Sequence, residues 1–260
     1  MATEYSPVTV QITERIAVVR LNRPLALNAI NAELRKMLTS TLSELDRGSD
    51  ADAIVLTGVG ERAFCAGQDL DESAAIDTTT LAEWLNRQHA MYQAVRNVDK
   101  PIVAAINGTA VGAGFQIALL CDLRVAHAAL KMGQPEVKAG LASIVGSYLL
   151  SLQIGHSLNQ QLSLTGELIS GERANQLGLV NDLVAPELVL PRAIERARAL
   201  ASLPGKALRA TKQRFREGTQ SGFEEACSAG IRYQLECYST GEPTRVMQAF
   251  LARRDSQKTN

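Results

Sequence analysis

A glycine-rich turn between two apolar runs is the feature that most constrains how this chain can fold. The segment 108–122, GTAVGAGFQIALLCD, has three glycines within its first seven residues. It follows the short apolar run Ile102–Ile106 and leads into the second apolar run FQIALL. Such runs on either side of a glycine turn are typical of a buried strand followed by a buried helix. Small residues in the turn also allow a ligand to approach the backbone closely.

Strand and helix patterns alternate along the chain up to about residue 185. Apolar runs bounded by polar residues predict strands at residues 8–12, 16–21, 53–58, 102–106 and 123–127, the first two joined as a hairpin. Asn31 is expected to cap an amphipathic helix, and a further helix is expected at 81–96. The segment 59–70 is expected to be a long loop. This alternation indicates an α/β fold.

The last third of the chain has a different pattern. Pro191, Pro204 and Pro243 separate four segments with helical spacing and no strand signal. These segments are RAIERARALASL, KALRATKQRFREG, FEEACSAGIRYQLECY and TRVMQAFLARRD. With 260 residues, of which 46% are hydrophobic, the chain suits one large core with a helical appendage.

Composition excludes several function classes. Lys+Arg and Asp+Glu both number 27 and aromatic residues make up 4%, which disfavours a nucleic-acid groove or an anionic membrane surface. The N-terminus shows no secretory signal, and no apolar stretch approaches the ~20 residues of a membrane span. We therefore expect a cytoplasmic protein that binds neither nucleic acid nor membrane. The cysteines lack metal-ligand spacing and are expected to be free thiols: Cys65, Cys121, Cys227 and Cys237.

The glycine turn is expected to hold an oxyanion rather than a phosphate. A dinucleotide fingerprint needs a third glycine where Ile117 stands, and no G-K-[ST] triplet of a P-loop follows. The first backbone N–H groups of a helix have no partner inside it, and the helix dipole favours negative charge there. Such groups can stabilise a carbonyl oxygen as it becomes an enolate. A second N–H is expected from the loop around Gly67.

Five motifs in order and in register carry a resemblance to a known family. They are LNRPLALNAI, AFCAGQDL, KPIVAAINGTAVGAGFQIALLCDLRVA, MGQPEVKAGL and LTGELISGERANQLGLVNDLV. Together they resemble the crotonase, or enoyl-CoA hydratase/isomerase, superfamily over about residues 8–255. The resemblance implies an α/β, crotonase-like spiral of repeated β-β-α units with a C-terminal helical oligomerisation region. It implies an acyl-CoA-binding core over residues 1–200 and, over 201–260, helices that form a trimer and cover the CoA site.

The resemblance also implies where an acyl-CoA thioester binds. The backbone N–H groups of Gln68 and Ala113 would hold its oxygen; Ala113 replaces a more usual glycine, but only its backbone would donate. Contacts with the substrate or its CoA would come from Leu25, Ala26, Leu27, Ala66, Asp69, Leu70 and Gly112. Phe250 and Arg253 match positions that reach a neighbour's CoA site, so a homotrimer or homohexamer is expected. No metal or redox cofactor is implied, because CoA is part of the substrate.

Two positions carry the proton chemistry of the family. Hydratases of the family use two glutamates, of which the later falls on Glu136 and the earlier on Gln116. Enclosure by apolar residues would raise the pKa of Glu136 toward the working range of a general base. Gln116 can position water or substrate, but an amide cannot carry a proton at neutral pH. Since a double-bond shift needs only one base, this departure favours isomerisation over hydration.

Other readings of the sequence stay open. The family often has a Pro-Gly-rich run where this chain has Ser143, Ile144 and Ser147. The identity of the acyl group of the substrate therefore stays open. The scaffold could support decarboxylation or thioester hydrolysis, or hold acyl-CoA without turnover. A serine peptidase is disfavoured, because no G-x-S-x-G elbow accompanies the three histidines. Among the remaining carboxylates, two are expected to be structural, Asp69 and Asp122, and two to be solvated, Asp71 and Glu72.

Overall fold

Two β-sheets organise the part of the chain that the structure describes. The computed structural model describes the backbone of residues 5–258 and the side chains of residues 5–252. The strands are β1 (Val8–Thr13), β2 (Ile16–Leu21), β3 (Ala53–Gly58), β4 (Ala63–Cys65), β5 (Ile102–Ile106), β6 (Thr109–Val111), β7 (Leu123–His127), β8 (Lys131–Gly133), β9 (Ile169–Ser170) and β10 (Asp182–Val184). The larger sheet has the order β1-β2-β3-β5-β7-β10, and the smaller has the order β4-β6-β8-β9.

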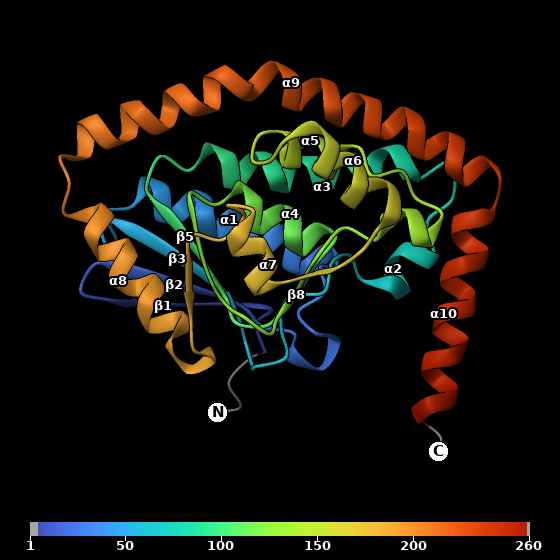
Figure 1. The fold of residues 1–260 in the computed structure, drawn as a ribbon, viewed down its shortest axis with the longest axis horizontal. Helices are drawn as coiled ribbons and strands as arrows, with labels where there is room; N and C mark the ends of the chain where they lie inside the picture. Colours follow the sequence, from blue (N-terminus) through green and yellow to red (C-terminus); the bar gives the residue numbers. More distant parts are fainter. Residues whose placement is uncertain (1–4, 259–260) are drawn as a thin grey trace.

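Helices surround the larger sheet and extend beyond it (Figure 1). They are α1 (Ala32–Arg47), α2 (Leu70–Ala74), α3 (Leu81–Asn97), α4 (Ala113–Leu120), α5 (Val145–Ser151), α6 (His156–Thr165), α7 (Gly171–Gln176), α8 (Val189–Ala201), α9 (Gly205–Ser239) and α10 (Glu242–Lys258). Short 3-10 turns are η1 (Pro24–Ala26), η2 (Glu136–Ala139) and η3 (Pro186–Leu188). None of the helices in the described part of the chain is long and apolar enough to cross a membrane.

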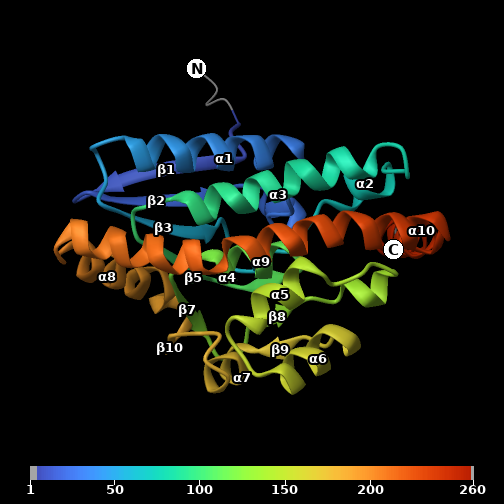
Figure 2. The ribbon, with the colours of Figure 1, turned by 90° about the horizontal axis from the view of Figure 1, so that it is seen from above.

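The central strands β3 and β5 of the larger sheet are buried on both faces, with α1 and α8 on opposite sides of the sheet (Figure 2). Successive side chains of a strand point to opposite faces. In β3, Ile54 and Leu56 therefore join the core that contains α1, whereas Val55 faces α8. Apart from the antiparallel β1–β2 pair, the strands of this sheet run parallel. This explains why β3 and β5 are continuous apolar runs rather than alternating ones.

The expected α/β class and most of the expected elements are confirmed. β1 and β2 form a hairpin, with Glu14 and Arg15 in the left-handed region at its turn. Asn31 caps α1, and its side chain accepts a hydrogen bond from the Leu34 N–H at 2.9 Å. The prediction of one long loop at 59–70 was wrong, because residues 63–65 form β4 and pair with β6. Three residues are too few for a pattern to reveal this strand.

The expected division of the C-terminal helices was also wrong in one place. Residues 205–239 form the single helix α9, where the sequence predicted two helices separated near Gly218 and Gly222. Within this helix Gly222 packs closely against Tyr148, and a Cβ there would lie 2.8 Å from the tyrosine ring. The apolar side chains of these helices are not all buried within the chain. Phe223 and Met247 are buried within the chain, whereas Phe250 is 52% exposed.

Gly114 gives a test of how tightly α4 packs against β4. A Cβ at this position would lie 2.2 Å from the Cys65 carbonyl oxygen. Gly114→Ala should therefore lower the free energy of unfolding by about 1–3 kcal/mol, because a backbone atom must move to admit the methyl group. Urea denaturation followed by circular dichroism measures this change.

Gly218→Ala is the matched control. Gly218 lies on α9 with no atom within 4 Å of a Cβ. The same substitution there should raise stability by about 0.5–1 kcal/mol, since alanine favours a helix more than glycine does. Equal shifts of the two variants in the same direction would contradict the proposed packing.

Candidate active site

Two glycine turns meet at the start of α4. Gly112 precedes α4 with φ 54°, and Gly67 follows β4 with φ 101°. A Cβ on Gly67 would lie 3.0 Å from the Val111 carbonyl oxygen and 3.7 Å from the Ala113 nitrogen, so the two turns are in contact. This contact brings the backbone N–H groups of Gln68 and Ala113 to the same place. Neither N–H has an acceptor among the described residues.

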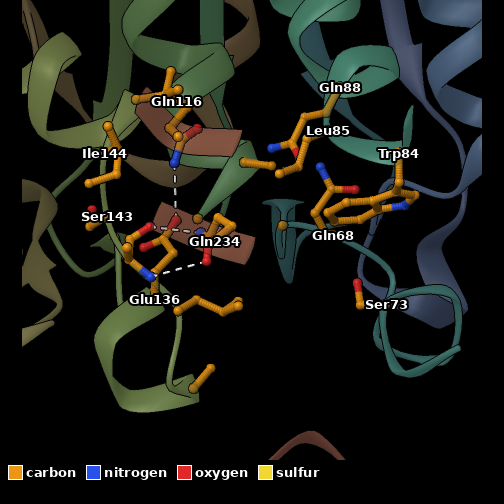
Figure 3. A pocket seen from close by; sticks show the side chains of 18 of the residues that line it. Gln68, Ser73, Trp84, Leu85, Gln88, Gln116, Glu136, Ser143, Ile144 and Gln234 are labelled. Atoms are coloured by element: carbon orange, nitrogen blue, oxygen red, sulfur yellow. Dashed lines mark hydrogen bonds between the residues drawn. The ribbon is translucent and has the colours of Figure 1, made fainter. Parts of the chain in front are cut away.

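A cavity of ≈ 200 Å³ opens beside these two residues. Figure 3 shows its labelled side chains in two groups that face each other. One group consists of Gln68, Ser73, Trp84, Leu85 and Gln88. The other consists of Gln116, Glu136, Ser143, Ile144 and Gln234. The backbone donors, the expected acid/base residue and the glutamine that replaces a second glutamate thus share one cavity.

Glu136 lies at the start of η2 with its carboxylate turned into the protein. Oε1 accepts a hydrogen bond from Gln116 Nε2 at 3.0 Å. Oε2 is buried without a partner, although other atoms of the residue are partly exposed. Burial raises the pKa of the Glu136 carboxyl to about 7, and the hydrogen bond from Gln116 opposes this shift only in part. A carboxyl with this pKa can take up and release a proton near neutral pH.

Gln116 is part of a buried row of polar side chains that the sequence did not reveal. A Cβ on Gly146 would lie 1.6 Å from Gln134 Oε1 and 3.0 Å from Gln116 Nε2, so both amides pack against this glycine. Gln134 Nε2 in turn donates to Ser163 Oγ at 3.0 Å. Ser163 donates to Asn159 Oδ1 at 3.0 Å. These contacts hold the base of the cavity in place.

The carboxylates that were expected to be structural or solvated divide differently from the prediction. Glu72 was expected to be solvated, which is wrong: it accepts hydrogen bonds from Arg35 at 2.9 Å and from the Trp84 indole at 2.6 Å. Asp69 is structural, as expected, because it caps α2 and pairs with Arg23 at 2.8 Å. Asp122 is also structural and pairs with Lys212 at 2.7 Å.

The structure brings most of the expected substrate-contacting residues together. Ala66, Leu70 and Gly112 line the cavity that contains Glu136. The η1 turn, which contains Leu25 and Ala26, lies next to them, because the Ala66 N–H donates to the Leu27 carbonyl at 3.0 Å. Leu25 is 97% exposed, and Leu25 and Leu27 border a separate hollow of ≈ 90 Å³. Phe250 on α10 lines neither of these two cavities, and the side chain of Arg253 lies outside the described residues.

Several lining residues were not found from the sequence. His89 lies on α3, and burial lowers the pKa of its imidazole to about 4, which keeps it neutral. Gln234 on α9 exchanges two hydrogen bonds with the Ala142 backbone, at 2.8 and 3.2 Å. Tyr238 and Met247 come from α9 and α10 of the same chain. The sequence predicted that these residues lie on helices, but it carried no signal that they border a cavity.

Titratable side chains elsewhere do not gather into a metal site. Within the described residues, no group of three or more His, Cys, Asp or Glu side chains could hold a metal ion. Cys65, Cys121, Cys227 and Cys237 are free thiols. Burial raises the pKa of Cys65, which lies closest to the glycine turns, to about 12. This thiol therefore stays protonated and is a poor nucleophile at neutral pH.

Known proteins resemble this chain along nearly its whole length. The sequence pattern of the enoyl-CoA hydratase/isomerase family matches residues 11–259. A short-chain-enoyl-CoA hydratase from Clostridium acetobutylicum is 32% identical over 252 residues, covering 96% of this chain and 97% of its own. An (E)-benzylidenesuccinyl-CoA hydratase from Thauera aromatica is 39% identical over 208 residues, covering 80% of this chain and 81% of its own.

The three-dimensional fold is also similar to that of a solved structure. The crystal structure of an enoyl-CoA hydratase/isomerase from Mycobacterium paratuberculosis superposes with a TM-score of 0.86 at 26% identity, covering 94% of this chain and 98% of that one. The expected crotonase-like architecture, with parallel sheets and a helical C-terminal region, is thereby confirmed. The chain therefore belongs to the enoyl-CoA hydratase/isomerase, or crotonase, family.

Proposed function

We propose that this protein is an enzyme that converts an enoyl-CoA thioester through an enolate intermediate. One observation carries the proposal: the unpartnered Oε2 of Glu136 lies in the same cavity as the free backbone N–H groups of Gln68 and Ala113. The first group can move a proton. The other two can stabilise the negative charge that forms on the thioester oxygen when the proton leaves.

The proposed reaction begins with the thioester oxygen at the two N–H groups. Glu136 removes a proton from a carbon of the acyl chain, and the electron pair of the broken C–H bond moves into the enolate. The protonated Glu136 then returns the proton to another carbon, and the double bond changes place. Because the pKa of Glu136 is about 7, giving and taking the proton are both accessible near neutral pH. These steps use CoA only as part of the substrate and require no metal or redox cofactor.

Gln116 decides between this reaction and hydration. Its amide nitrogen is engaged with Glu136 Oε1 at 3.0 Å, and the side chain has no titrating proton. It can hold a water or the substrate, but it cannot act as a second acid or base, which favours the isomerase. Hydration is the second candidate, because the named relatives from Clostridium acetobutylicum and Thauera aromatica are hydratases.

The proposal also covers the oligomeric state of the protein, which involves the C-terminal helices. We propose that residues 1–200 form the acyl-CoA-binding core, and that residues 201–260 join copies of the chain into a homotrimer or homohexamer. Large apolar side chains on the outer surface of α9 and α10 support this: Phe215, Tyr233 and Phe250 are 74%, 41% and 52% exposed. Burying them between copies would remove apolar surface from water.

A panel of enoyl-CoA thioesters read by mass spectrometry tests the reaction class. A product of unchanged mass with a shifted double bond indicates isomerisation, and the gain of one water indicates hydration.

Glu136→Gln should reduce both reactions by ~10²–10⁴-fold, because it removes the only proposed base. Gln116→Glu should raise hydration of crotonyl-CoA by about tenfold or more, since it adds the missing acid/base group. Loss of CO₂, release of free CoA or binding without any product would contradict the proposal.

Ala113→Pro tests the proposed oxyanion site. Ala113 is the first residue of α4, a position where proline is well tolerated, but proline has no N–H to donate. Turnover should fall by ~10²–10³-fold while the thermal unfolding midpoint changes little. Ala113→Ser keeps the N–H and serves as the control, so it should retain most of the activity. Normal turnover by folded Ala113→Pro would show that this N–H does not hold the oxyanion.

The pH dependence of kcat/KM reports the state of Glu136. Since the ionised carboxylate acts as the base, kcat/KM should rise with pH through about 7 and level off above it. The sign follows from burial, which raises the pKa and so delays ionisation to higher pH. An exposed glutamate would place the rise near ~4.3 instead. Initial rates between pH 5 and 9 in buffers of constant ionic strength measure the profile, and a midpoint below about 5 would rule out Glu136 as this base.

A further inference from the structure

The carboxamide of Gln68 is held in one orientation by a buried arginine. One guanidinium nitrogen of Arg35 donates to Gln68 Oε1 at 3.1 Å and to Glu72 Oε1 at 2.9 Å. Arg35 is only 4% exposed, and its guanidinium carbon lies 5.6 Å from the centre of the Trp84 ring. A guanidinium has donors but no acceptor, so the atom of Gln68 that faces it is the carbonyl oxygen. The amide nitrogen of Gln68 is therefore turned away from Arg35.

This nitrogen is a donor without an acceptor. Gln68 Nε2 is buried and has no hydrogen-bond partner among the described residues. Gln68 lines the cavity that also contains Glu136 and Gln116, and Figure 3 shows it in the group that faces them. A ligand oxygen placed at this nitrogen would supply the acceptor that the buried donor lacks. The hydrogen bond from Arg35 also polarises the amide and strengthens its remaining N–H groups.

The proposed oxyanion site does not explain this arrangement. That site uses only the backbone N–H of Gln68, which any residue except proline would supply. The neighbouring Gln88 shows how an amide of the same cavity is satisfied when it has a structural role: its Nε2 donates to the Tyr92 hydroxyl at 2.6 Å. Gln68 shares the cavity and the residue type, but its nitrogen lacks such a partner.

We propose that Gln68 Nε2 donates a hydrogen bond to an oxygen atom on the acyl group of the substrate. The substrate class is then an acyl-CoA whose chain carries a ketone or carboxylate oxygen near the thioester, rather than a plain hydrocarbon chain. The oxygen lies near the thioester because the backbone of the same residue binds the thioester carbonyl. Gln68 thus selects the acyl group, and Arg35 is a positioning residue that fixes its amide. This inference rests on the proposed function and names the substrate class of that site.

Binding of unreactive saturated thioesters tests the inference without relying on turnover. Isothermal titration calorimetry on the purified full-length protein compares butyryl-CoA, which has no extra oxygen, with acetoacetyl-CoA and succinyl-CoA. The ketone and the carboxylate represent the neutral and the anionic form of the acceptor. At least one of the two should bind about tenfold more tightly than butyryl-CoA, as one added hydrogen bond allows.

Three variants at two positions assign the preference to one side chain. Gln68→Met has a side chain of similar length but no donor. The ratio of the dissociation constant of butyryl-CoA to that of the preferred thioester should therefore fall to about one. Gln88→Met removes the other cavity amide, whose nitrogen is already engaged, so the ratio should stay near its wild-type value. Gln68→Glu replaces the donor with an acceptor and should reverse the preference, most strongly for succinyl-CoA.

The outcomes separate this inference from the proposed function. A preference for the ketone alone, the carboxylate alone or both, lost in Gln68→Met and kept in Gln88→Met, supports the inference and identifies the acceptor. Equal affinity of the wild type for all three thioesters, or a preference unchanged in Gln68→Met, overturns the inference and leaves the proposed function intact. Failure of every thioester to bind overturns both.

Discussion

The contact between the start of α4 and the end of β4 is the constraint on which the rest of the site depends. Gly114 lies so close to Cys65 that no side chain fits between them. The same close packing brings the turns at Gly67 and Gly112 into contact. A larger residue at Gly114 would separate the helix from the strand and move the backbone N–H groups of the two turns apart. The geometry of the proposed oxyanion site is thus a consequence of core packing and needs no flexible loop.

Burial of one carboxyl among amides gives the cavity its electrostatic character. Glu136 lies beside Gln116, and Gln134 packs against the same glycine as Gln116. Neither of these two amides carries a charge at neutral pH. The Arg35 cation behind the opposite group is paired with Glu72. With no cation among the described side chains close enough to offset desolvation, the pKa of Glu136 rises to about 7. A second carboxylate at position 116 would change this balance, because two charges in one pocket repel.

The helical region is attached to the core at several points along α9, and this attachment extends to the cavity. Lys212 donates to Asp122 at 2.7 Å near the start of α9. Further along, Arg96 of α3 lies 4.5 Å from the centre of the Phe223 ring. Near its end Gln234 fixes the Ala142 backbone, which lines the cavity. A change in how α9 packs would therefore alter the cavity as well as the outer surface.

The sequence by itself determined the class of fold, the order of most elements and the two turns that carry the backbone donors, because hydrophobic periodicity and glycine clusters are local signals. Register with a known family also pointed to Glu136 and Gln116. Tertiary structure decided what local patterns cannot encode. It paired the three residues of β4 with a distant strand, continued α9 through Gly222, and paired Glu72 with an arginine 37 residues away. The orientation of the Gln68 amide belongs to this second group, because it depends on an arginine that only folding brings beside it.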